Sequence, residues 1–100
     1  MRPPLYTKKY TPGSTEVEEL RVMQQAFAEL ASARSRYPDW PTDIVHASAV
    51  MVEEATEVLK AANNARWNHH SGTCEELRKE VIQTIAMCLR LLTETPALRV

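Results

Sequence analysis

The sequence IVHASAVMVEEATEVLKAANNAR, residues 44–66, decides the fold because its apolar side chains recur at helical spacing. At about 100° per residue, the apolar residues that share one arc are Ile44, Ala47, Met51, Ala55, Val58, Ala62 and Ala65. A narrow polar stripe on the other side consists of His46, Glu53, Glu57, Lys60 and Asn64. The many alanines allow another helix to approach closely. We therefore expect a packed helix that begins after a cap at Thr42 or Asp43.

A second helical pattern follows, and its apolar residues cover nearly the whole circumference. Thr73 caps this helix, Pro96 ends it, and its apolar residues are Leu77, Val81, Ile82, Ile85, Ala86, Met87, Cys88, Leu89, Leu91 and Leu92. A helix that is apolar most of the way round is central in its fold or is shared with another subunit. The short connection over residues 67–73 predicts that the two helices pack antiparallel.

An amphipathic helix over residues 15–36 precedes both of these. Ser14 or Thr15 caps it, and Thr15 with Glu18 fits a capping box. The segment YPDWP, residues 37–41, ends it because each proline lacks an N–H and favours extended geometry in the residue before it. The sequence thus predicts an all-α fold, an antiparallel helical hairpin plus a third long helix, that completes a four-helix-type bundle through oligomerisation.

The expected organisation is one all-α domain over residues 14–95, a basic extended arm at 1–13 and a tail at 96–100. A domain this small buries about 60–68% of its unfolded surface, so burial between subunits would add stability. The arm carries Arg2, Lys8 and Lys9. Either it is a solvated tail or it contacts phosphate.

Composition excludes several classes of partner. A net charge of −1 provides no overall field to recruit a nucleic acid polymer or an acidic membrane, so an anionic substrate needs a local site. Cys74 and Cys88 lie in or beside one helix about 21 Å apart, which excludes a disulfide between them. No signal peptide follows Met1, and no apolar stretch approaches the about 18 residues of a membrane span. We expect a cytoplasmic protein.

Two short polar stretches interrupt the apolar helices. Glu53-Glu54-Ala55-Thr56-Glu57 lies in the first helix of the hairpin, and Glu80-Val81-Ile82-Gln83 lies in the second. Glu57 precedes the connection by about as many residues as Glu80 follows it, so an antiparallel hairpin brings the two stretches level. Glu80 lies among apolar residues and must be paired, protonated or bound to a metal. Facing oxygen ligands are what a hard cation such as Mg²⁺ needs.

Interpretations of these residues that involve no Mg²⁺ site remain open. Glu53 or Glu57 with Lys60 can form ordinary ion pairs on a solvated helix face. His46 shares the polar stripe and can contact the acidic cluster or a phosphate. A zinc site would draw on His46, His69, His70 and Cys74, but their spacing matches no known zinc pattern.

The paired stretches resemble the EExxE…ExxD signature of the all-α nucleoside triphosphate pyrophosphohydrolases, the MazG-like group. Glu53-Glu54-x-x-Glu57 is followed by 22 residues and then by Glu80-x-x-Gln83. The surrounding residues, including YPDWP before the second helix, resemble the short members found in phages and mobile elements. The resemblance covers residues 14–92.

The resemblance implies Mg²⁺-dependent hydrolysis of nucleoside triphosphates, often non-standard or deoxy forms, to the monophosphate and pyrophosphate, with Mn²⁺ able to substitute. It assigns the metal ligands as Glu54, Glu57, Glu80 and Gln83 and leaves Glu53 as an accessory carboxylate. The candidate catalytic groups are then Glu53, Glu57 and Glu80. It also implies a homodimer or homotetramer with sites near subunit interfaces.

The substrate-binding residues are less defined by the sequence. The cations that can clamp the triphosphate are Lys60, Arg78, Lys79 and Arg90. Trp40 either stacks on a base or packs on the end of the bundle. Gln83 departs from the family pattern, because an amide oxygen brings no charge to the metal. The alternative is therefore a non-catalytic helical module of the same fold that binds a nucleotide or a protein.

Overall fold

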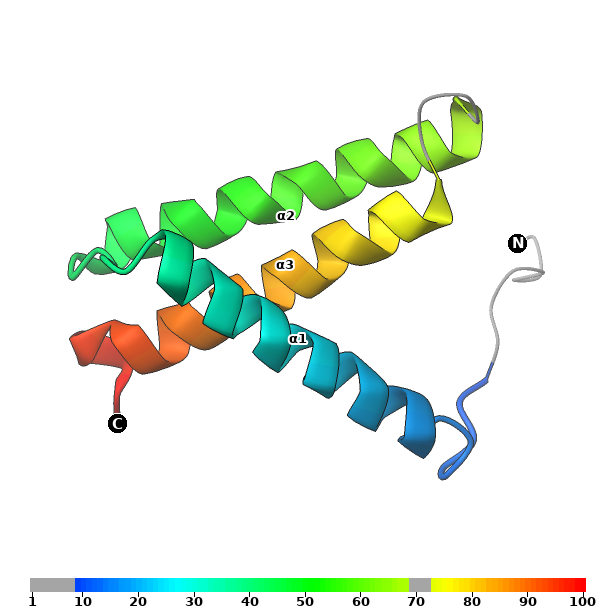
Figure 1. Cartoon of the computed structure of the whole chain (residues 1–100), viewed down its shortest axis with the longest axis horizontal. Helices are drawn as coiled ribbons and strands as arrows, with labels where there is room; N and C mark the ends of the chain where they lie inside the picture. The colour runs from blue at the N-terminus through cyan, green and yellow to red at the C-terminus, as the bar shows by residue number, and fades with distance from the viewer. Residues whose placement is uncertain (1–8, 69–72) are drawn as a thin grey trace, which may run out of the picture.

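The computed structural model describes residues 9–68 and 73–100 and consists there of helices without strands (Figure 1). The elements are α1 (Glu16–Arg36), α2 (Ile44–Trp67), α3 (Cys74–Glu94) and the 3₁₀ helix η1 (Pro96–Leu98). The predicted all-α class is confirmed. In this part of the chain, no helix combines the length and the apolar character needed to cross a membrane.

Two of the three expected helix caps form as predicted. The Asp43 carboxylate accepts a hydrogen bond of 2.8 Å from the His46 N–H, and the Thr73 hydroxyl accepts one of 3.1 Å from the Glu76 N–H. The capping box at Thr15 is wrong. Thr15 has φ −123° and ψ 7° rather than the extended geometry of a capping residue, and its hydroxyl donates to the Glu19 carboxylate instead.

The helices α2 and α3 lie side by side and antiparallel, and α1 crosses α3 and packs on it through its C-terminal half (Figure 1). The buried apolar residues in the described part of the chain are Ala26, Leu30 and Ala33 of α1, Ala47 of α2 and Ala86 of α3. Four of these five are alanines, so the helices approach closely around a core of small volume. Many of the larger apolar side chains lie instead on exposed helix faces.

A buried arginine joins the connection between α1 and α2 to the end of α3. The Arg90 side chain is 2% exposed, donates twice to the Glu94 carboxylate and donates once to the Tyr37 carbonyl, at 2.9–3.0 Å. Its guanidinium lies 4.8 Å from the centroid of the Trp40 ring. The Trp40 Nε1–H donates to the hydroxyl of the buried Thr95 at 2.9 Å.

These contacts bear on two residues identified from the sequence. Trp40 packs on the end of the bundle against Arg90 and Thr95 and also lines a cavity, so stacking on a base stays a prediction. Arg90 is not available as a phosphate clamp, because its donors are engaged with Glu94 and a backbone carbonyl inside the protein.

The ionisation of Glu94 depends on this network. Burial alone would raise its pKa, but the hydrogen bonds and charges of Arg90 and Arg34 outweigh burial and lower the pKa below 4.5. Arg34 donates its Nε–H to Glu94 at 2.8 Å, so the carboxylate joins α1 to α3. A carboxylate with a lowered pKa stabilises the fold when it is charged and loses that contribution in acid.

Replacing Glu94 by glutamine is expected to lower the free energy of unfolding by about 3 kcal/mol at neutral pH, because the buried Arg90 loses its charged partner. The stability of the wild-type chain is expected to fall as the pH drops below 4.5, and the gap between the two proteins should then narrow. Urea unfolding over a pH series measures both effects. Glu18→Gln, which removes an exposed ion pair with Arg21, is the control and should change the stability by less than about 1 kcal/mol. If the difference in the free energy of unfolding between the wild-type chain and Glu94→Gln stays constant with pH, the charge of Glu94 is not what stabilises the fold.

Candidate functional site

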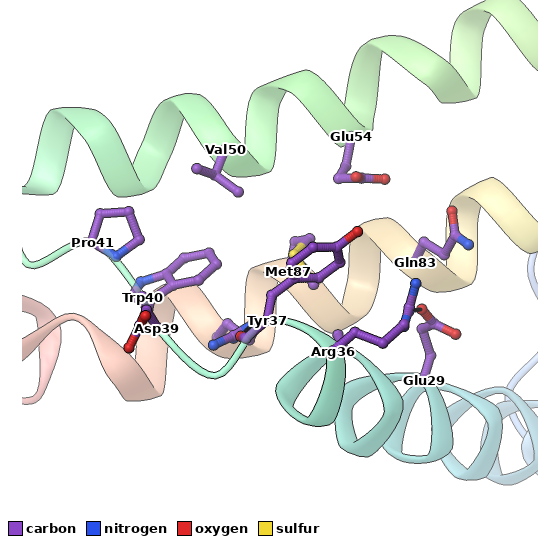
Figure 2. Close-up of a pocket in the computed structure, with 12 residues that line it drawn as sticks. Glu29, Arg36, Tyr37, Asp39, Trp40, Pro41, Val50, Glu54, Gln83 and Met87 are labelled. Carbon is purple, nitrogen blue, oxygen red and sulfur yellow. Dashed lines mark hydrogen bonds and ion pairs between the residues drawn. The ribbon is translucent and has the colours of Figure 1, made fainter.

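A cavity of about 380 Å³ opens where α2, α3 and the end of α1 meet the connection between α1 and α2 (Figure 2). Its lining residues are Glu29, Ala33, Arg36, Tyr37, Asp39, Trp40, Pro41, Val50, Glu54, Gln83, Met87 and Arg90. In Figure 2, Trp40, Pro41 and Val50 lie toward one end together with Asp39, and Glu29, Arg36, Glu54 and Gln83 lie toward the other. A volume of this order suits a small-molecule ligand.

The antiparallel hairpin brings the two polar stretches of the sequence close together at this cavity. Figure 2 shows Glu54 on α2 facing the side of the cavity that Gln83 on α3 lines. Burial raises the pKa of Glu54, and the charge of Glu80 on α3 raises it further, followed by the charges of Glu53, Glu57 and Glu29. The carboxylate of Glu54 therefore lies in a negative and partly desolvated environment.

The environment of Glu80 differs from the one inferred from the sequence. Its side chain is half-buried rather than enclosed among apolar residues, because the packing of α1 and α2 on α3 leaves it partly exposed. Burial alone thus does not force Glu80 to be paired, protonated or bound to a metal. Glu53 and Glu57 are exposed, outside the residues that line the cavity. Across residues 9–68 and 73–100, no three His, Cys, Asp or Glu side chains gather into a group that would hold a metal.

The donor types at the site nevertheless fit a hard cation. Glu54, Glu80 and Gln83 offer carboxylate and amide oxygens, which Mg²⁺ prefers, and no sulfur or imidazole is among the residues that line the cavity apart from the thioether of Met87. A divalent cation would also relieve the repulsion that raises the pKa of Glu54.

A second hollow of about 300 Å³ adjoins the first on the other side of Gln83. Its lining residues are Gln25, Glu29, Glu75, Arg78, Lys79, Ile82 and Gln83. The Arg78 guanidinium donates to the Gln25 side chain at 2.9 Å. Arg78 and Lys79, two of the cations identified from the sequence, therefore lie beside the same wall as Gln83.

The remaining candidates from the sequence lie away from both hollows. Lys60 and His46 are exposed, and Lys60 takes part in none of the ion pairs found in the described part of the chain. Cys74 is exposed, while His69, His70 and residues 1–8 of the arm lie outside the described residues.

Glu29 and Arg36 of α1 are site residues that the sequence analysis missed. Glu29 lines both hollows and forms an ion pair of 2.9 Å with Arg36, which lines the larger one. Glu29 follows Ala26 by three residues and precedes Ala33 by four, but the burial of both alanines is evident only from the structure. Glu29 therefore lies on the edge of the face that packs on α3.

Comparison of the chain with protein family models, curated proteins and solved structures finds no match.

Replacing Glu54 by glutamine is expected to raise the melting temperature at neutral pH by about 4 °C, the shift that corresponds to about 1 kcal/mol in a domain of this size. Glutamine removes a charge that burial and neighbouring carboxylates disfavour. Because the pKa of Glu54 is raised, its protonation in acid has the same effect, so the difference from the wild-type chain should shrink as the pH falls. Calorimetry of the metal-free proteins measures the shift, with Glu76→Gln, an exposed glutamate outside both hollows, as the control. A Glu54→Gln variant that melts well below the wild-type chain would show that the carboxylate is a structural group.

Proposed function

We propose that the chain is a Mg²⁺-dependent nucleoside triphosphate pyrophosphohydrolase that releases nucleoside monophosphate and pyrophosphate from non-standard or deoxy nucleotides. The observation that carries this proposal is that Glu54 from the polar stretch of α2 and Gln83 from the polar stretch of α3 line the same cavity. These are the two halves of the motif that resembles the MazG-like enzymes. Hydrolysis of a triphosphate needs concentrated negative ligands for a cation next to a space for the nucleotide.

The proposed metal ligands are Glu54, Glu57, Glu80 and Gln83, through carboxylate and amide oxygens. Mg²⁺ bound there, or Mn²⁺ in its place, would neutralise charge on the triphosphate and on the departing pyrophosphate. Glu53, the accessory carboxylate, would either hold a second metal or help to orient the attacking water toward the α-phosphorus. Glu57 and Glu80 carry both roles expected of them, as ligands and as catalytic carboxylates.

The two hollows suit different parts of a bound nucleotide. The larger one offers the faces of Trp40 and Tyr37 to a base, and the smaller one offers Arg78 and Lys79 to phosphate oxygens. Glu29 and Gln83 line both, so the junction is the place for the metal-bound part of the triphosphate. Lys60 and His46 flank the acidic stripe of α2 and are secondary candidates for phosphate contacts.

Self-association belongs to the same proposal. The described core contains four alanines and one leucine, and large apolar side chains remain exposed on all three helices. A second copy that covers some of these faces completes a four-helix-type bundle, as a dimer or a tetramer.

A non-catalytic module that binds nucleotides is the second candidate. Gln83 in place of an aspartate and the exposure of Glu53 and Glu57 favour it, because fewer charged ligands surround the cavity than in the full motif. Such a module would be stabilised by a nucleotide without turning it over.

Incubation with a panel of ribonucleoside and deoxynucleoside triphosphates and Mg²⁺ tests the enzymatic proposal. We expect pyrophosphate and the monophosphate from at least one nucleotide, with no diphosphate. Glu57→Gln and Glu80→Gln are expected to lower kcat/KM by about 100-fold or more, because each removes a charged ligand. Glu76→Gln, an exposed glutamate in the first turn of α3, is the control and should retain activity.

Two outcomes would redirect the assignment. Pyrophosphate from no nucleotide, with either Mg²⁺ or Mn²⁺, rejects catalysis, and thermal stabilisation by a nucleotide in the same samples then favours the binding module. Full activity in both variants would mean that the site has been assigned to the wrong residues.

A further inference from the structure

Two helix faces carry regularly spaced residues that nothing in the described chain covers. The α1 seam consists of Val17, Leu20, Gln24, Phe27 and Ala31, and the α2 seam consists of Val45, Ala49, Val52, Thr56 and Leu59. All ten residues are exposed. The six largest apolar side chains among them are between 53% and 72% exposed. Exposed apolar rows of this kind mark interaction surfaces.

The spacing within each seam is that of a coiled-coil interface. Steps of three and four residues alternate in both, and each seam extends over about 21 Å. The α1 seam begins with a step of three, whereas the α2 seam begins with a step of four. Two helices with these patterns match layer by layer when they run antiparallel.

We propose that the α1 seam of one copy of this chain packs antiparallel on the α2 seam of a second copy, and reciprocally, around a twofold axis. The facing pairs are Val17 with Leu59, Leu20 with Thr56, Gln24 with Val52, Phe27 with Ala49 and Ala31 with Val45. A twofold arrangement forms this contact twice, so both seams of both copies are covered.

The sizes of the facing side chains support this register. Phe27 faces Ala49, and Val45 faces Ala31, so that a large side chain meets a small one at two of the five layers. The interdigitation of large and small residues is what close packing between helices requires.

Charge supports the same register. Arg21 follows Leu20 and Glu53 follows Val52, so both occupy the flanking position next to the seam. In the antiparallel register these positions lie on the same edge of the interface, about 3 Å apart along the helix axis. Within the described residues of one copy, the ion pair that Arg21 forms is an exposed contact of 3.7 Å with Glu18. Arg21 of the partner subunit would therefore pair with Glu53 and bring a cation to the acidic stripe of α2.

A second copy is the occupant that fits these observations, since one chain supplies both seams with equal length, complementary step order and opposite flanking charges. The inference rests on the self-association proposed above, and its contact between Arg21 and Glu53 reaches a carboxylate of the proposed site. The oligomeric state and the turnover of nucleotides are measured separately, so the failure of one proposal is distinguishable from the failure of the other.

Sedimentation velocity over a concentration series tests the surface. We expect a dimer, and we expect Leu59→Glu to raise its dissociation constant by at least about 30-fold. The matched control is Leu92→Glu, which changes a similarly exposed leucine of α3 outside both seams and should leave the dimer intact. A wild-type chain that stays monomeric rejects both self-association and the seams. If Leu92→Glu dissociates the dimer and Leu59→Glu does not, self-association stands and the proposed seams are rejected.

Cysteine pairing tests the register without disrupting either seam. In a background in which the exposed Cys74 is replaced by serine, a mixture of Val17→Cys and Leu59→Cys chains is expected to form a mixed disulfide dimer. A mixture of Val17→Cys and Val45→Cys chains, whose cysteines would lie at opposite ends of the interface, should not. Crosslinking in the second mixture, or of Leu59→Cys chains with themselves alone, would overturn the proposed register.

Discussion

The enclosure of the Arg90 guanidinium is the interaction that joins the end of α1 and the connection after it to the end of α3. Its hydrogen bonds reach Glu94 at the end of α3 and the Tyr37 carbonyl in the connection, and its face stacks on Trp40. Glu94 in turn accepts from Arg34 of α1. A buried cation tolerates few alternative partners, so the network fixes the end of α1 and the connection against α3. The cavity exists because these segments are held there.

The other charged groups around the cavity are balanced differently. Glu54 experiences burial and four neighbouring carboxylates, whereas Glu29 has its own counterion in Arg36. The protein thus neutralises the α1 wall of the cavity and leaves the hairpin wall negative. Uncompensated charge at a cavity is unfavourable for the fold and is commonly found where a ligand supplies the missing charge.

The features that could be predicted from the sequence are those that depend on interactions between residues close together in the chain. The bounds of the three helices and the caps at Asp43 and Thr73 follow from spacing and hydrogen bonds within a few residues. Tertiary contacts determined the rest. The half-exposure of Glu80 depends on how many helices cover α3, and the burial of Arg90 depends on Glu94 and on Tyr37, a residue far away in sequence. Glu29 entered the site because α1 crosses α3, which its own periodicity does not specify.

The alanine core has a consequence for how this sequence can change. Ala26, Ala47 and Ala86 are fully buried, so the core loses little volume when a side chain is shortened. Lengthening any of them forces the helix axes apart, at a cost of about 1–3 kcal/mol for each added group. Most small domains are sensitive chiefly to truncation of large core residues. This one is sensitive to enlargement of its buried alanines.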